Sequence, residues 1–323
     1  MGIKSKLSAL RNWAPLGGFI ILFALFAGLT NGDNLGISNL QSLLNQVMVM
    51  ALVATGAVFV FGSGSIDMSM GACVSLSAVL GGMVGIETGS IALVLLVCVG
   101  SAIALGLLKG LFAAYVEAPS FIITIVMGMV ITACVLVMMG DTANLLLPTP
   151  GTEPNTIPIF DFEQMTIVNL ITLIGFFALC WMLFSLGTLG RSVKMTGGSL
   201  VVARQTGLPI RRTVILSYLL GALGIGLAAF ILVIRTRTVG ANTGISMGTD
   251  VLVALVLGGM PLTGGPRSSI YAGLIGAASI TVLTNGLTMI GLELEYIQIC
   301  RGLVFIAVVF IASMSYRTKL LPR

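Results

Sequence analysis

One carboxylate, Asp67, interrupts a long apolar stretch in the run Gly62 to Gly71, which reads G-S-G-S-I-D-M-S-M-G. An aspartate at the centre of a membrane-spanning helix costs roughly 2.5–3.5 kcal/mol on insertion scales, so such residues usually face a protein interior or a watery path. The surrounding glycines and serines loosen the helix where backbone groups most need internal partners. A broken helix around one buried acid is typical of a solute pathway.

Three roles for Asp67 fit these residues. The carboxylate could cap a half-helix that begins near Met68, where it would satisfy backbone donors and suit the helix dipole. It could instead hydrogen-bond the hydroxyls of a polar solute, or it could bind a coupling cation. Ser69 is a weaker pore candidate beside it.

The segment Ser246 to Met260 echoes Ser69 to Met83 at an offset of 177 residues, with nine of fifteen positions identical. Apolar sequence of low complexity produces chance matches, so coincidence is the alternative. A true repeat places the copies five predicted spans apart and therefore in opposite orientations. Transporters with inverted repeats hold substrate near the membrane midplane, between discontinuous helices. We therefore predict an inverted five-helix repeat with broken helices at the repeat starts, and Asp250 as a second pathway candidate.

The residue types that carry catalysis are missing. The chain has no histidine, and its five cysteines show no CxxC spacing. His-ligated metals and Ser-His chemistry are thereby excluded, and the cysteines are expected to be small buried side chains. No G-x-x-x-x-G-K-[ST] motif occurs, so the chain does not itself bind ATP through a P-loop. We predict no catalytic residue, no metal site and no cofactor; transport energy would come from a partner subunit or an ion gradient.

Composition places these segments in a membrane. Hydrophobic residues make up 57% of the 323 residues and charged residues 8%, whereas soluble domains carry about 25% charged residues. A helix needs about 20 apolar residues to cross the hydrocarbon core. We therefore expect an all-α polytopic protein with one transmembrane domain over 1–323. The ten predicted spans are 14–31, 42–61, 65–85, 90–109, 120–140, 166–187, 213–234, 250–263, 268–290 and 297–315, of which the eighth is short enough to be re-entrant or tilted.

The basic residues predict the orientation, because cytoplasmic loops are enriched in lysine and arginine. Ten spans place both termini in the cytoplasm, together with Lys109. Only Arg235, Arg237 and Arg301 fall outside. The segment 141–165, rich in proline and acids, then forms an extracytoplasmic loop with room for a short interfacial helix.

The segment 188–212 lies in the cytoplasm in this topology and carries five basic residues without one acid. A glycine-serine turn is followed by a short helical run at 200–205, and then by a glycine placed to end it. A plain basic loop that only fixes topology is the alternative, although start and stop signals exceed what topology requires. We predict a structured coupling loop whose candidate residues are Gly197, Gly198, Ser199, Arg204 and Gly207.

Four stretches of the sequence carry a family resemblance. They are Ser65 to Gly71 preceded by Asn45 and Gly56, Pro119 to Ile125 with its Thr124, Gly197 to Leu208, and Thr249 to Gly265. They resemble the G-I-D-L-S-V-G, P-A-F-I-x-T-L, cytoplasmic G-G-N and E-L-D-A-I-A motifs of the permease subunits of bacterial ATP-binding-cassette importers for ribose and related simple sugars. The similarity runs over nearly the whole chain. Ser199, Leu200 and Gly248 stand where the family has Asn, Glu and Glu, which makes this a divergent member.

The resemblance implies partners and a location. It implies two ATP-binding cassette ATPase subunits contacted by 197–208, an extracytoplasmic solute-binding protein, and a second permease copy or a related permease. The assembly would lie in the bacterial cytoplasmic (inner) membrane, surrounded by lipid and without nucleic acid. Asn45 and Thr124 become weaker pore candidates. Arg235 and Arg237, expected to be exposed outside, are candidates for docking acidic residues of the binding protein, with lipid-phosphate contact as the alternative.

The predicted function is a permease subunit that passes a small polar solute, such as a monosaccharide, in an importer driven by a separate ATPase. Three alternatives stay open. The first is a secondary carrier coupled to an ion through Asp67 or Asp250. The second is a permease of the same family for a nucleoside or another non-sugar solute. The third is a membrane scaffold or receptor that transports nothing.

Overall fold

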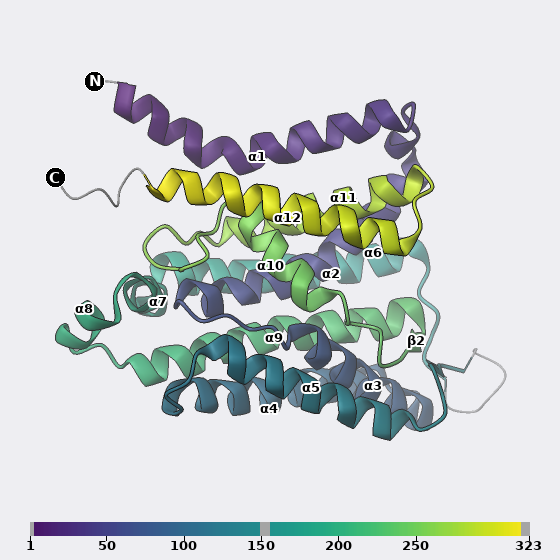
Figure 1. The fold of residues 1–323 in the computed structure, drawn as a ribbon. Coiled ribbons are helices and arrows are strands. Elements are labelled where there is room, and N and C mark those ends of the chain that lie inside the picture. Colours follow the sequence, from purple (N-terminus) through teal and green to yellow (C-terminus); the bar gives the residue numbers. More distant parts are fainter. Residues whose placement is uncertain (1–2, 149–155, 318–323) are drawn as a thin grey trace.

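The computed structural model describes residues 3–148 and 156–317, with side chains from 13 to 148 and from 156 to 310. These residues form a helical bundle with one pair of very short strands (Figure 1). The helices are α1 (Ile3–Leu29), α2 (Ile37–Gly62), α3 (Met70–Thr88), α4 (Ile91–Tyr115), α5 (Ser120–Met139), α6 (Phe162–Trp181), α7 (Thr188–Gly198), α8 (Leu200–Gln205), α9 (Ile210–Thr236), α10 (Met247–Leu257), α11 (Tyr271–Met289) and α12 (Leu294–Arg317). A 3-10 turn (Asp33–Leu35) precedes α2, and a π turn (Met182–Leu186) extends α6.

Seven helices in the described part of the chain are long and apolar enough to cross a membrane, namely α2, α3, α4, α5, α6 with its π turn, α9 and α11. The chain is therefore a multi-pass, predominantly helical membrane protein. Each of the ten predicted spans overlaps one helix, but α10 has only 11 residues. At 1.5 Å per residue it is about 16 Å long, too short to cross the hydrocarbon core. The span predicted at 250–263 is thus a short helix followed by a loop.

Helices α2 and α9 form the centre of the bundle. They pack on each other, α4 packs against α9, and α11 packs against α2. The approach of α2 to α9 is close because small residues line it: a Cβ atom on Gly56 would lie 2.8 Å from the carbonyl oxygen of Leu220. Such contacts suit helices in lipid, where packing drives association. In contrast, α4, α5 and α6 leave most of their apolar surface uncovered, which makes it available to lipid or to another subunit.

The two ends of the bundle differ. The start of α1, the end of α12 and the pair α7–α8 lie at one end, as Figure 1 shows on its left side. At the other end, β1 (Leu145–Leu146) pairs antiparallel with β2 (Thr238–Val239) just after α9. The described part of the predicted loop 141–165 therefore holds a strand and the start of α6 in place of an interfacial helix. Residues 149–155 of that loop lie outside the described residues.

Candidate functional site

The chain between α2 and α3 is non-helical, as the glycine and serine content predicts. Gly64 has a φ of +83°, a left-handed conformation that favours glycine, and α3 starts only at Met70. Side chains of α5 satisfy the exposed backbone here: the Ile66 N–H donates to Ser120 Oγ at 3.0 Å, and the Met68 N–H donates to Thr124 Oγ1 at 3.1 Å. Irregular backbone at membrane depth requires such internal partners. Thr124 is fully buried and holds the break in place.

Asp67 lies in this break and forms a buried ion pair. Its Oδ2 lies 2.6 Å from Lys109 Nζ on α4, and both side chains are at most 2% exposed. Its Oδ1 accepts hydrogen bonds from the backbone N–H and the hydroxyl of Ser69, at 2.9 and 2.6 Å. Lys109 also donates to Ser69 Oγ at 3.0 Å. Both carboxylate oxygens of Asp67 thus have partners within the protein. These contacts connect the start of α3 to α4.

The position of Lys109 corrects the sequence analysis, which places it in the cytoplasm. Helix α4 continues to Tyr115, beyond the predicted end of the span, so Lys109 lies within the helix and turns inward. A buried cation in a membrane segment needs a paired anion, and Asp67 supplies it. In the described residues, no group of three or more His, Cys, Asp or Glu side chains is close enough to hold a metal ion.

A second ion pair lies at the start of α10. Asp250, in the first turn of that helix, accepts from Nη1 of Arg301 at 3.0 Å through each of its oxygens. Arg301 also donates to Thr284 Oγ1 through Nε at 3.0 Å and Nη2 at 2.7 Å. The predicted topology places Arg301 outside the membrane. Instead, its side chain is only 14% exposed and ties α12 to α10 and α11.

The starts of α3 and α10 meet at backbone distance. A Cβ atom on Gly71 would collide with the carbonyl oxygen of Gly244, and one on Gly248 would lie 2.9 Å from the carbonyl oxygen of Met68. Ser75 Oγ donates to the carbonyl oxygen of Ala241 and accepts from the Gly244 N–H, both at 2.9 Å. The two segments that share the sequence echo are therefore in direct contact.

A cavity of about 500 Å³ adjoins this junction. It lies between α3, α5 and the start of α10, and small or hydroxyl-bearing side chains form much of its wall. Ser75, Thr132 and Thr249 supply the hydroxyls, and the rest of the wall includes the apolar side chains of Met68, Ile125, Met129, Leu136 and Ile245. Sites for small molecules typically measure about 300–1,000 Å³. A molecule of monosaccharide size fits such a space, and the hydroxyls can hydrogen-bond it.

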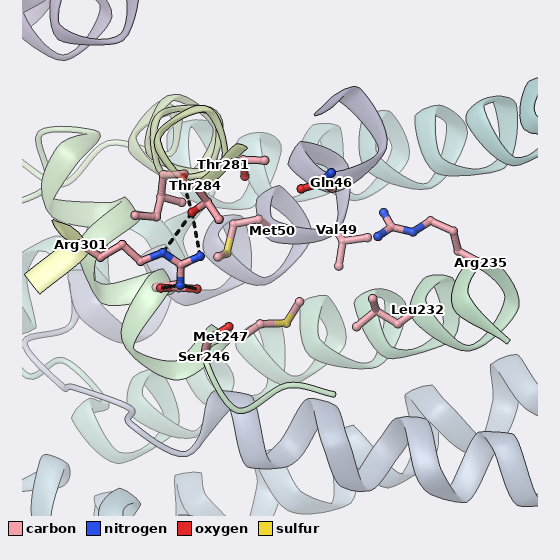
Figure 2. Close-up of a pocket in the computed structure, with 12 residues that line it drawn as sticks. Gln46, Val49, Met50, Leu232, Arg235, Ser246, Met247, Thr281, Thr284 and Arg301 are labelled. Atoms are coloured by element: carbon pink, nitrogen blue, oxygen red, sulfur yellow. Dashed lines mark hydrogen bonds and ion pairs between the residues drawn. The ribbon is translucent and has the colours of Figure 1, made fainter. Parts of the chain in front are cut away.

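The predicted pathway residues occupy three places. Asp67, Ser69 and Thr124 belong to the buried cluster beside the junction. Asp250 lines a second cavity, of about 190 Å³, between α2 and α9–α12 (Figure 2). Asn45 lies away from both cavities, where its Oδ1 accepts from Asn169 Nδ2 at 2.6 Å and joins α2 to α6.

The two arginines predicted to dock a binding protein are not the exposed side chains that this prediction assumes. Arg237 donates to the carbonyl oxygens of Ile157, Pro158 and Pro148, and so fastens the segment before α6. Arg235 points into the second cavity from the side opposite Arg301, as Figure 2 shows. Both are half-buried because the neighbouring loop and helices provide contacts that the sequence does not reveal.

The predicted coupling loop contains two helices, α7 and α8, joined at Ser199. Ser199 Oγ accepts from the Val202 N–H at 3.4 Å, and Gly207 ends the element with a φ of +71°. Arg204 is exposed. Leu200, Val201 and Val202 are apolar yet at least half exposed, which leaves an uncovered apolar surface on α8.

The base of this loop touches both irregular segments through glycines. A Cβ atom on Gly197 would collide with the carbonyl oxygen of Gly62 and would lie 2.6 Å from the Gly265 nitrogen. Gly198 lies against Pro266, and the Gly265 N–H donates to the Gly62 carbonyl oxygen at 3.0 Å. A displacement of α7 would therefore move the end of α2 at Gly62 and the loop after α10 at Gly265.

Comparison with known proteins identifies the family of the chain. The model of a protein family described as "Branched-chain amino acid transport system / permease component" matches residues 39–309. The chain belongs to this permease family. No solved structure matches the chain.

Individual relatives are named as permeases for ribose, autoinducer 2 or galactofuranose. The chain is 30% identical to a ribose import permease protein of Bacillus subtilis over 92% of both chains. It is 30% identical to an autoinducer 2 import system permease protein of Yersinia pseudotuberculosis over 95% of this chain and 92% of the relative. A galactofuranose transporter permease protein of Escherichia coli is 27% identical over 85% of this chain and 79% of its own.

Several residues at the breaks of this permease escape the sequence analysis. Lys109 and Arg301 are the partners of the two acids, and the partly buried Ser120 supports the first break. Away from the breaks, the buried Asn169 joins α6 to Asn45 of α2. The signal for the two cations is their location in apolar stretches, because charged residues in membrane segments usually pair with one another. No comparable signal marks Ser120, since a serine in a membrane helix is common.

Proposed function

We propose that the chain is the permease subunit of an ATP-driven importer and forms the path of a small polar solute, a monosaccharide or a related compound. The observation that carries the proposal is the cavity of about 500 Å³ at the junction of the two broken segments. It occurs in a chain whose relatives are named ribose, galactofuranose and autoinducer 2 permeases. A secondary carrier is less well supported, because Asp67 and Asp250 are each already paired with a cation.

The proposed architecture has ten membrane crossings and an inverted repeat, and α10 makes the eighth crossing together with the irregular chain on either side of it. When the offset of 177 is added to their residue numbers, α2, α3, α4 and α5 overlap α9, α10, α11 and α12 in that order. Corresponding helices also make corresponding contacts. Helix α4 packs on α9, and its counterpart α11 packs on α2; likewise α3 packs on α4, and α10 packs on α11. The contact between Gly71 and Gly248, which correspond in the echo, supports a pseudo-twofold axis at the junction.

The proposed location is the bacterial cytoplasmic (inner) membrane, with both termini in the cytoplasm. The start of α1, the end of α12 and α7–α8 share one end of the bundle (Figure 1). The α7–α8 segment is the basic loop 188–212, so the positive-inside rule assigns this end to the cytoplasm.

The proposed coupling element is α8 with its flanking glycines. Its uncovered apolar residues, Leu200, Val201 and Val202, provide a docking surface for an ATPase subunit. The tight contact of Gly197 with Gly62 and Gly265 then carries movement of α8 to the segments that follow α2 and α10. Closure of the ATPase pair would thereby favour one of two packings of the permease dimer. A solute-binding protein delivers solute at the opposite end.

Uptake of labelled solute by cells that express the whole importer tests this proposal. Val201→Asp places a charge on the apolar surface of α8, and it should abolish co-purification of the ATPase and lower uptake at least about tenfold. The matched control, Val201→Ile, keeps the surface apolar and should retain both. Uptake that survives ATP depletion but collapses with an ionophore would refute the ATP-driven mechanism in favour of an ion-coupled carrier.

A further inference from the structure

The cavity of about 190 Å³ shown in Figure 2 contains two arginines in different states. Arg301 is fully engaged, because three of its nitrogens donate to Asp250 or Thr284. Asp250 in turn uses both oxygens for Arg301. These two charges cancel each other, so the pair leaves the cavity without net charge.

Arg235 has no such partner. No described carboxylate forms an ion pair with it, and its Nη1 is buried without a hydrogen-bond acceptor in the described part of the chain. A guanidinium stays charged under all ordinary conditions. Arg235 is half-buried, and even partial burial of an unpaired charge is unfavourable, so native proteins supply a counter-charge or use the group for binding. The cavity consequently carries an excess of one positive charge.

The position of Arg235 near the end of α9 offers a simpler explanation, in which its side chain extends to the water at the membrane surface. The geometry disagrees with that explanation. Arg235 lines the cavity and points inward between α2 and α9, toward Val49 and Gln46 in Figure 2. Although the side chain as a whole is only half-buried, its Nη1 is buried.

We propose that this cavity binds the oxyanion group of a small ligand, a phosphate or a carboxylate, through the guanidinium of Arg235. Phosphate and carboxylate match the fork of the guanidinium with two parallel hydrogen bonds. Gln46 and Thr281 add an amide and a hydroxyl to the wall of the same cavity. The volume restricts the ligand to a small anion or to the charged end of a larger molecule.

This anion site goes beyond the proposed transport of a neutral solute, because a monosaccharide needs no unpaired cation. It also lies apart from the larger cavity: none of the residues around Arg235 lines the space between α3 and α5. The charged end could belong to a free anion or to an anionic lipid headgroup, which share the oxyanion chemistry.

Calorimetric titration of the full-length chain tests the site. The chain is placed in phosphatidylcholine nanodiscs and titrated with inorganic phosphate and with malonate, with chloride at equal ionic strength as the reference. Wild type should bind phosphate or malonate saturably. Arg235→Gln should weaken that binding roughly ten- to hundredfold, as expected for loss of a charge-assisted hydrogen bond. Arg212→Gln is the matched control, because it removes an exposed arginine from the other end of α9 and should change nothing.

A lipid measurement separates the two sources of the anion. Wild type purified from membranes that contain phosphatidylglycerol should retain this lipid through Arg235 if a headgroup fills the cavity, and mass spectrometry counts the lipid retained. Should Arg235→Gln fail to fold, Met247→Trp, which fills the cavity without removing the charge, should also abolish binding. The proposal is overturned if wild type binds neither anion and retains no lipid, or if the folded variants bind as tightly as wild type.

Discussion

The buried pair of Asp67 and Lys109 makes Asp67→Asn a strongly destabilising substitution. At 2.6 Å the two charges attract by about 6 kcal/mol for an effective dielectric constant of about 20. The loss of hydration of both groups offsets much of that attraction. Removing one member of a buried pair typically costs about 3–5 kcal/mol, because the other charge stays buried and unpaired. We expect a loss in that range for Asp67→Asn.

The structure predicts an order among the variants. Lys109→Met should be less harmful than Asp67→Asn, since Asp67 keeps two hydrogen bonds donated by Ser69 whereas Lys109 would keep only its 3.0 Å bond to Ser69 Oγ. The double variant, Asp67→Asn with Lys109→Met, should recover most of the stability. Replacing a whole buried ion pair by neutral groups of similar size is often neutral or stabilising.

Reversible unfolding by SDS in mixed micelles measures these four proteins as a double-mutant cycle. A coupling free energy of about 2 kcal/mol or more is expected for two groups in direct contact. Asp67→Asn with wild-type stability, or a double variant as unstable as the sum of the two single variants, would refute this reasoning. Solute uptake adds an independent result: near-normal uptake by the double variant would eliminate a cation site at Asp67.

Three further outcomes follow from the same contacts. Gly197→Ala places a Cβ atom against Gly62 and Gly265, so it should reduce solute uptake at least about tenfold while ATPase binding stays intact. The control Gly100→Ala adds a Cβ atom that meets nothing within 4 Å and should leave uptake unchanged. Asp250→Asn, measured by the same SDS unfolding, should cost about 1–3 kcal/mol, less than Asp67→Asn, because Arg301 is partly exposed and keeps Thr284. Arg237→Gln releases three backbone carbonyls and should speed cleavage by an added protease within 141–165, without loss of the folded bundle on size exclusion.

Much of the fold could be predicted because the lipid environment imposes simple rules on sequence. Apolar length alone locates all ten helices that overlap predicted spans, and the serines and glycines before Met70 locate the first break. The short eighth segment shows where this rule fails. The apolar run 250–263 continues past Leu257, but two glycines follow and Gly259 adopts a φ of +85°, so the helix stops. Hydropathy measures the environment of a segment and not its conformation.

The site was less predictable, because its contacts join residues far apart in the chain. The candidate acids could be found from their apolar surroundings, but their partners Lys109 and Arg301 lie 42 and 51 residues away. Arg235 and Arg237 illustrate the opposite error. They are two residues apart at the end of one helix and look alike in sequence, yet one points into a cavity and the other holds a loop.

The two ion pairs also limit what the sequence echo means. At the constant offset of 177 residues, Asp67 corresponds to Gly244 and Asp250 corresponds to Cys73, so the acids are not equivalent positions. The helices that supply the cation and the threonine also differ between the two segments. In the first half the cation comes from α4, and a threonine of α5 bonds the backbone of the break. In the second half the cation comes from α12, and a threonine of α11 bonds that cation.

Thr124 and Arg301 even correspond to each other at that offset. One of the nine positions shared by the two segments is instead the glycine pair that lets them touch, Gly71 and Gly248. In the proposed repeat, a backbone contact near the pseudo-twofold axis constrains both copies at once, because a side chain added to either segment would meet the backbone of the other. A charge pair constrains only its own half, so each half is free to fasten its break with a different set of residues. The shared requirement is therefore the close approach of two broken segments, and the charges serve to hold each segment there.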